Sequence, residues 1–190
     1  MRELIDPLPP SWRVDPLPEI RAEMLARPSK IFVLDDDPTG PQTVSGVALL
    51  TEWSKQSLRS EFHASEEATF ILTNSRSVPE AEAVRINREV GQNLLEVSAE
   101  LEMSITVISR SDSTLRGHFP SEVEALAEAL HPQGEYDALI FAPFFQEGGR
   151  YTIGDVQYAR DGDNLIPVAE TPFAKDTAFG YESSNLCDWM

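Results

Sequence analysis

Five short runs of apolar, mostly β-favouring residues recur along the chain and predict buried strands. They are Ile31–Leu34, Val47–Leu50, Phe70–Thr73, Ile105–Ile108 and Ala138–Ala142. Such runs lack the alternation of apolar and polar positions that marks a half-exposed strand. They are typical of strands covered on both faces in a parallel sheet.

Residues with helical spacing fill the intervals between these runs. Ser77 and Glu80 have the form of a capping box, and apolar positions three or four apart predict a helix from there to about Leu101. Pro120 suits the first turn of another helix, which extends to Leu130. Shorter helices are expected over residues 20–26 and 55–62. Strands that alternate with helices predict an α/β fold, with a mainly parallel sheet flanked by helices.

The two ends of the chain depart from this alternation. Residues 1–15 carry three prolines and little periodicity, which indicates an extended arm. Near the C-terminus, Val156–Arg160 and Leu165–Val168 enclose an Asp-Gly turn and predict a β-hairpin. We therefore expect an arm and a short helix over residues 1–29, followed by one α/β domain over residues 30–190.

Composition and charge narrow the classes of function. With 190 residues, 41% hydrophobic and 25% charged, the chain is typical of a globular domain. Its apolar runs are far shorter than the ~20 residues of a membrane span. A net charge of −17 argues against nucleic-acid binding, which needs a basic surface. Cys187 is the one cysteine, so no internal disulfide can form, and a cytoplasmic location is expected.

Polar and charged clusters follow four of the predicted strands. They span residues 35–40, 73–76, 109–117 and 143–152. Ligands of open α/β sheets bind beyond the carboxyl ends of the strands, so we expect these clusters to share one edge. Four arginines, Arg76, Arg110, Arg116 and Arg150, would then lie near three consecutive aspartates.

These residue types allow more than one interpretation. Arginine binds a carboxylate or phosphate with two parallel hydrogen bonds, which suits a small anionic substrate, although ordinary ion pairs are the alternative. Asp35, Asp36 and Asp37 repel one another, which suits a general base or a Mg²⁺ ligand, and a helix N-terminal cluster is the alternative. Asp112 is equally compatible with a turn role, and His118 with a surface role.

Three motifs in order resemble the N-terminal sugar-binding domain of the four-carbon acid sugar kinase family. The Asp-Asp-x-Thr-Gly motif that follows a strand stands at Asp36–Gly40. The Asp-Ser-Thr-Leu-Arg-Gly signature is unbroken at Asp112–Gly117, and the third motif runs from Pro143 to Thr152 and contains Gly-Arg-x-Thr. With the elements between them, the motifs cover roughly residues 30–185.

The resemblance implies ATP-dependent phosphorylation of the terminal hydroxyl of a four-carbon sugar acid, such as threonate, erythronate or an oxo-tetronate. It implies that Asp36 or Asp37 is the base or an Mg²⁺-linked carboxylate, and that Arg116 and Arg150 hold the substrate carboxylate. The further substrate contacts that it implies are Thr39, Gly40, Ser75, Arg76, Asp112, Ser113 and Gly149.

The same resemblance implies that part of the enzyme is missing. Family members are longer, and a second domain binds their nucleotide, whereas this sequence contains no Gly-x-x-x-x-Gly-Lys-Ser/Thr loop. We expect ATP and Mg²⁺ to require that domain, in cis or in trans, and this chain alone to bind no cofactor and to be inactive. Thr43 and Arg110 depart from residues common in the family, which leaves the sugar acid open. Homo-oligomerisation also stays open.

Two rival interpretations use the same residues. Asp35, Asp37 and Thr39 resemble the opening motif of haloacid dehalogenase-like phosphatases, but the later lysine and the paired acids at a strand end are missing. A stand-alone module that binds small carboxylates or a partner protein is the other alternative. The missing nucleotide-binding domain keeps that alternative open.

Overall fold

A four-stranded parallel sheet forms the centre of the molecule. The computed structural model describes residues 4, 6–132, 134 and 136–190. The strands are β1 (Lys30–Asp35), β2 (Ala48–Leu50), β3 (Ala68–Leu72) and β4 (Ile105–Arg110). Their order is β2-β3-β1-β4, and every neighbouring pair is parallel. Four of the five predicted strands and the parallel sheet are therefore confirmed.

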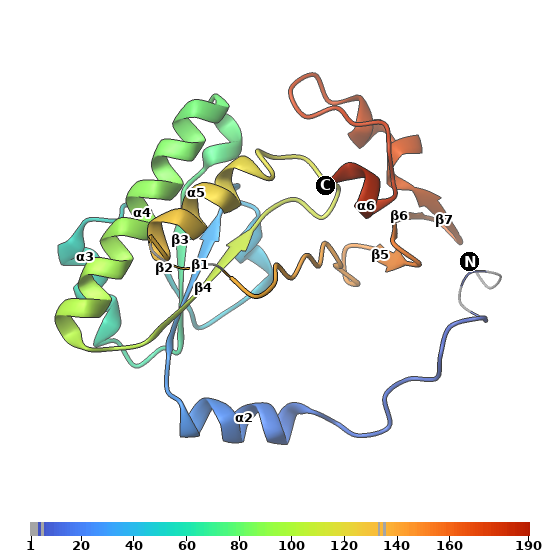
Figure 1. Cartoon of the computed structure of the whole chain (residues 1–190). Helices are drawn as coiled ribbons and strands as arrows, with labels where there is room; N and C mark the ends of the chain where they lie inside the picture. The colour runs from blue at the N-terminus through green and yellow to red at the C-terminus, as the bar shows by residue number, and fades with distance from the viewer. Residues whose placement is uncertain (1–3, 5, 133, 135) are drawn as a thin grey trace.

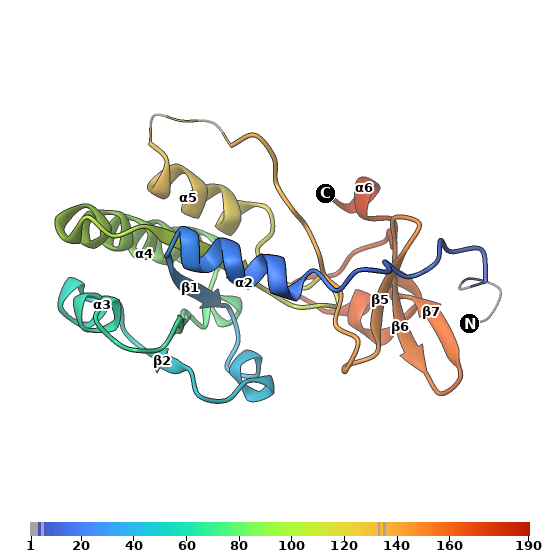
Figure 2. The ribbon, with the colours of Figure 1, turned by 90° about the horizontal axis from the view of Figure 1, so that it is seen from below.

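Three helices cover one face of this sheet (Figures 1 and 2). They are α3 (Lys55–Phe62), α4 (Glu80–Leu101) and α5 (Ser121–Leu130). Phe32 and Leu34 of β1 point into a core cluster with Leu58 of α3, Leu94 of α4 and Leu126 of α5. The apolar spacing of α4 and α5 is thereby explained, because the buried stripe of each helix packs on the strands.

A second, antiparallel sheet lies on the other side of the parallel sheet (Figure 2). It contains β5 (Arg150–Ile153), β6 (Val156–Asp161) and β7 (Asn164–Pro167) in that order. The hairpin of β6 and β7 confirms the prediction, and Gly162 supplies a φ of 57° at its turn. β5 was not predicted.

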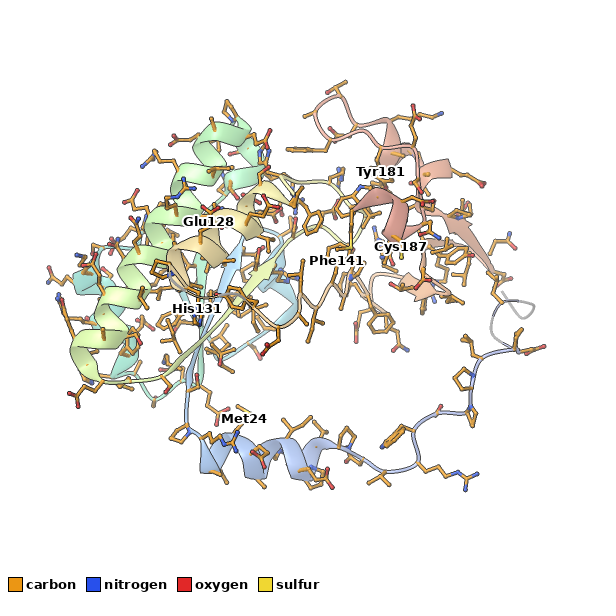
Figure 3. The ribbon with its side chains drawn as sticks, in the orientation of Figure 1. Met24, Glu128, His131, Phe141, Tyr181 and Cys187 are labelled. Carbon is orange, nitrogen blue, oxygen red and sulfur yellow. The ribbon has the colours of Figure 1, made fainter. Side chains whose placement is uncertain are left out.

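The C-terminal segment joins the two sheets. It contains three short helices, η3 (Val168–Glu170), η4 (Pro172–Lys175) and α6 (Leu186–Trp189). Leu115, from the loop after β4, packs in a small cluster with Val168 and Leu186. Phe141 and Tyr181 both lie at this junction (Figure 3).

The prediction of a fifth strand over Ala138–Ala142 is wrong. The segment forms no strand, and Leu139 and Ile140 are 57% and 89% exposed. Its C-terminal end is held elsewhere, because Phe141 packs on Phe119 and Trp189 at centroid distances of 5.1 and 5.5 Å. Among the described residues, β4 pairs only with β1, so the outer edge of β4 is left unpaired.

The predicted capping box is also wrong, although the helix that it opens is present. Pro79 occupies the N-cap of α4 and makes no side-chain capping bond. Ser77 belongs to a preceding turn, η2 (Ser75–Ser77), and its hydroxyl donates to the Asn74 carbonyl at 2.8 Å. The local turn therefore competes for the serine that the pattern assigned to the helix.

The N-terminal region contributes nothing to the core of the described chain. Helix α2 (Leu17–Ala26) includes the predicted short helix and has no buried residue. Residues 6–16 contain no helix or strand, and residues 1–3 and 5 of the predicted arm lie outside the described residues. None of the helices that the structure describes is long and apolar enough to cross a membrane.

Candidate functional site

The carboxyl ends of β1, β3 and β4 meet at one edge of the parallel sheet. Asp35, the last residue of β1, is in register with Leu72 of β3 and Arg110 of β4. The Thr73 amide donates to the Asp35 carbonyl at 2.9 Å, and the Arg76 amide donates to the Asp36 carbonyl at 3.1 Å. The polar segments after these three strands are therefore adjacent, as the sequence predicted.

Asp36 is committed to holding Arg76. The Arg76 guanidinium donates through Nη2 and Nε to the two carboxylate oxygens of Asp36, at 2.6 and 3.0 Å. The Ser111 hydroxyl donates to the same carboxylate at 2.7 Å, and the Asp36 side chain is only 4% exposed. Burial alone would lower the pKa of Arg76, but Asp36 and its neighbours raise it. This pair fixes a guanidinium at the sheet edge.

Asp35 lies beneath that edge. Its carboxylate is 2% exposed and accepts a hydrogen bond from Arg110 Nη1 at 2.7 Å. Burial raises the pKa of Asp35, while Arg110 opposes the shift. A Cβ on Gly40 would lie 1.8 Å from Asp35 Oδ2, so glycine is required to close over the pair. Asp35 cannot reach a phosphate ester from this position, which argues against the haloacid dehalogenase-like interpretation.

Asp37 is the aspartate of the three that solvent reaches. Its side chain is 26% exposed, and its Oδ1 accepts hydrogen bonds from the Thr39 hydroxyl and from the Thr39 amide at 2.8 Å. Arg76 Nη1 lies 3.4 Å from Oδ2. Burial would raise the pKa of Asp37, but the bonds from Thr39 and the charges of Arg76 and Arg116 outweigh it and lower the pKa. Asp37 is therefore an ionised, accessible carboxylate.

The Asp-Ser-Thr-Leu-Arg-Gly signature forms a tight turn after β4. Asp112 accepts hydrogen bonds from the Thr114 hydroxyl and from Arg116 Nε, the latter at 2.6 Å. These contacts, with the charge of Arg116, outweigh burial and lower the pKa of Asp112. Gly117 adopts a φ of 134°, and a Cβ there would lie 2.7 Å from the Ser111 hydroxyl. The final glycine of the signature thus lets the turn approach Asp36 and Ser111 closely.

Arg116 and Arg150 meet at a single aromatic ring. The guanidinium carbons lie 5.1 Å and 5.5 Å from the centroid of Phe173. Arg116 also has a longer ion pair with Asp176, at 3.7 Å. Arg150 donates through Nη1 to the Gly148 carbonyl, while its Nε is buried and has no hydrogen-bond partner among the described residues. Arg150 comes from β5 of the antiparallel sheet, not from a loop after a fifth parallel strand.

Three of the residues expected to contact the substrate make hydrogen bonds or close contacts with other residues of the protein. Ser75 is 1% exposed, and its hydroxyl lies 3.1 Å from that of Thr73. The Ser113 carbonyl accepts a hydrogen bond from Gln157 Nε2 at 2.8 Å. Gly149 has a φ of 73°, and its carbonyl accepts from the Arg160 amide at 2.8 Å. Ser75, Ser113 and Gly149 therefore make contacts within the protein, and their contact with a substrate stays a prediction.

Glu122 was missed by the sequence interpretation. It is buried at the start of α5, and its Oε1 accepts a hydrogen bond from Asn87 Nδ2 at 3.1 Å. Burial raises the pKa of Glu122, and the charge of Asp36 adds to the effect. An acidic residue in the first turn of a helix is ordinary, so the sequence holds no signal that this one lies behind the site.

A cavity of about 680 Å³ opens beside this cluster. Arg76 and Gly117 line it at the sheet edge, and His118, Phe179 and Tyr181 also line it. His118 Nε2 lies 2.9 Å from the Val78 carbonyl, and its ring contacts Phe179 edge-on at 4.9 Å. Burial raises the pKa of Tyr181 to about 12, so its hydroxyl stays protonated. The volume would hold a small organic acid, but Arg116, Arg150 and Asp37 are not among the residues that line this cavity.

Three of the carboxylates at this edge are paired with arginine side chains. The part of the chain that the structure describes contains no group of three or more His, Cys, Asp or Glu side chains placed to hold a metal ion. The carboxylates of Asp35, Asp36 and Asp112 each bind an arginine instead. Their charge is therefore already balanced by guanidinium groups.

Comparison with known proteins identifies a family to which this chain is similar. The model of the family described as "Sugar-binding N-terminal domain" matches residues 31–190. No curated protein matches the chain. A crystal structure of a domain of unknown function from Bordetella bronchiseptica, with bound citrate and described as a domain-swapped dimer, is 25% identical with a TM-score of 0.60.

That match covers 83% of this chain and 38% of the solved chain, so this chain spans well under half of the relative's length. The family match covers both sheets and every motif that carried the resemblance. The chain therefore belongs to the family of sugar-binding N-terminal domains, the family that its motifs indicated.

Proposed function

We propose that this domain binds a small sugar acid for phosphorylation, with the acid's carboxylate on Arg116 and Arg150. The observation that carries the proposal is the position and charge of the Arg150 guanidinium. This guanidinium stands beside that of Arg116 on the same ring, and the described residues supply no ion pair for it. A carboxylate bound to the two guanidinium groups would balance this charge.

Asp37 is the group that we assign to the sugar's terminal hydroxyl. A general base must be ionised and must reach the proton that it accepts, and Asp37 has a lowered pKa and an exposed carboxylate. Asp36 is less suited, because both of its oxygens accept hydrogen bonds from Arg76. We therefore assign Asp36 the task of positioning Arg76 beside the acceptor.

ATP and Mg²⁺ would be supplied by a nucleotide-binding domain, in cis or in trans. Phosphoryl transfer then depends on the hydroxyl being oriented toward the γ-phosphate. Family membership and the citrate bound to the solved relative support an acid as the ligand. Four-carbon acids of the threonate, erythronate or oxo-tetronate type are the substrates that we propose.

Isothermal titration with threonate, erythronate and citrate tests the acid site. We expect Arg116→Ala and Arg150→Ala to weaken binding by roughly tenfold or more, because each removes a charge-assisted hydrogen bond. Arg88→Ala is the matched control, since Arg88 pairs with Glu128 on the helical face. If the wild-type chain binds none of these acids, the assignment of the site is wrong.

A coupled kinase assay tests the reaction. The chain is mixed with a purified nucleotide-binding domain of the family, and ATP-dependent phosphorylation of the acid is measured. Asp37→Asn should reduce turnover by roughly 10²-fold or more, the usual contribution of a general base. Acid binding without any phosphorylation would instead favour a stand-alone carboxylate-binding module.

We also infer that the chain forms a homodimer, for which the domain-swapped relative is the support. The unpaired edge of β4 and the exposed side chains of Leu139 and Ile140 offer apolar surface for a second copy. Size-exclusion chromatography with light scattering should give twice the monomer mass. Leu139→Asp together with Ile140→Asp should return the mass to that of a monomer.

A further inference from the structure

We infer that Phe173 is a positioning residue that sets the two arginines of the acid site for one carboxylate. The inference rests on the proposed function, because it names the side chain that arranges Arg116 and Arg150. Both guanidinium carbons lie within 5.5 Å of the Phe173 ring centroid. No motif of the sequence includes Phe173.

The backbone on both sides of Phe173 is anchored. Phe173 belongs to η4 (Pro172–Lys175), and Thr171 before it is buried and donates through its hydroxyl to the Val168 carbonyl at 2.6 Å. Ala174 after it is buried, and its carbonyl accepts a hydrogen bond from the Tyr181 amide at 3.2 Å. The ring therefore stands on a fixed turn and does not simply follow the arginines.

The two arginines need such a support because their charges repel. Arg116 has carboxylate partners in Asp112 and Asp176. No ion pair is found for Arg150 within the described residues, so its charge is not balanced in the same way. The negative face of an aromatic ring attracts a guanidinium, and stacking also restricts the side chain to few rotamers. Phe173 can thus stabilise two like charges near each other without occupying their hydrogen-bond donors.

This arrangement has a consequence for specificity. Stacking on the ring uses none of the N–H donors, so those that are not already bonded to Asp112 and to the Gly148 carbonyl stay available to a planar acceptor with two oxygens. A carboxylate offers such an acceptor, and the lactone of the same sugar acid does not. Loss of the ring should therefore weaken binding of the acid and leave the weaker binding of the lactone unchanged.

Two replacements of Phe173 separate the effect of the aromatic ring from the effect of side-chain volume. Phe173→Met keeps an apolar side chain but removes the π face, and Phe173→Tyr keeps both. We expect Phe173→Met to weaken threonate or citrate binding roughly tenfold, and Phe173→Tyr to stay within about threefold of wild type. Phe144→Met is the matched control, because the Phe144 ring packs on Tyr151. In an Arg150→Ala background, Phe173→Met should have much less effect, since the two changes act on one unit.

A second measurement needs no ligand. The Arg116 and Arg150 Nε–H signals in NMR spectra should carry ring-current shifts from Phe173, and Phe173→Met should move them while Phe144→Met should not. Unmoved arginine signals would overturn the inference, and so would unchanged acid affinity in Phe173→Met beside a wild type that binds. If the signals move but wild type binds no acid, the proposed function fails and the geometric role of Phe173 stands.

Discussion

Replacing Arg76 with methionine would leave a carboxylate buried without its cation. Asp36 is 4% exposed and accepts two hydrogen bonds from Arg76, at 2.6 and 3.0 Å, and Ser111 would be the remaining donor described for it. Breaking a buried pair on one side typically costs ~3–5 kcal/mol, because the other charge stays in a low-dielectric site. Domains of this size are stable by roughly 5–15 kcal/mol, so we expect a large fall in the free energy of unfolding.

Urea unfolding followed by tryptophan fluorescence measures this change at pH 7. Arg59→Met is the control, because the pair of Arg59 with Glu100 is exposed and such pairs contribute at most about 1 kcal/mol. Adding Asp36→Asn to Arg76→Met should recover part of the loss, since a neutral amide needs no counter-charge. If Arg76→Met lowers the free energy of unfolding no more than Arg59→Met does, the buried Asp36–Arg76 pair does not stabilise the fold as argued.

Three further predictions follow from single positions. Gly117→Ala should destabilise the domain by about 1–3 kcal/mol in thermal unfolding, since its φ of 134° and the nearby Ser111 hydroxyl exclude a Cβ; an unchanged midpoint would contradict this. The raised pKa of Glu122 means that the folded state holds its proton more tightly, so stability is full below pH 4.5 and falls as the pH rises. Glu122→Gln should flatten that fall above pH 4.5 in denaturant titrations, and an unaltered slope would count against it. Leu94→Ala should cost ~2–5 kcal/mol in urea unfolding, because Leu94 is fully buried, and a loss below about 1 kcal/mol would show that the core repacks.

Local pattern was a good guide to the elements of the fold and a poor one to their pairing. The runs at β1, β3 and β4 are apolar because the sheet buries them, and that requirement is visible in the sequence. Ala138–Ala142 has the same character, but whether such a run joins a sheet depends on contacts far along the chain. Here Phe141 packs on Phe119 and Trp189 instead, which no local pattern encodes.

For the candidate site too, the sequence predicts where some residues lie but not what they contact. Asp36, Asp37 and Arg76 could be expected at one edge because each follows a strand, and parallel strands end together. The role of each residue could not be predicted, because it depends on which carboxylate the fold buries. Phe173 also lies outside every motif, and the C-terminal segment that carries it is bonded to the signature loop, where the Tyr181 hydroxyl donates to the Thr114 carbonyl at 2.6 Å.

The setting of Arg116 and Arg150 in a chain of net charge −17 has a kinetic consequence. A small anion that comes within about one Debye length of the surface, about 8 Å at physiological ionic strength, meets the repulsion of the net negative charge, whereas at contact it meets two guanidinium groups. Added salt should therefore speed the arrival of the anion while it weakens the final contact and speeds departure. The site would thus select its ligand by residence time and not by rapid capture.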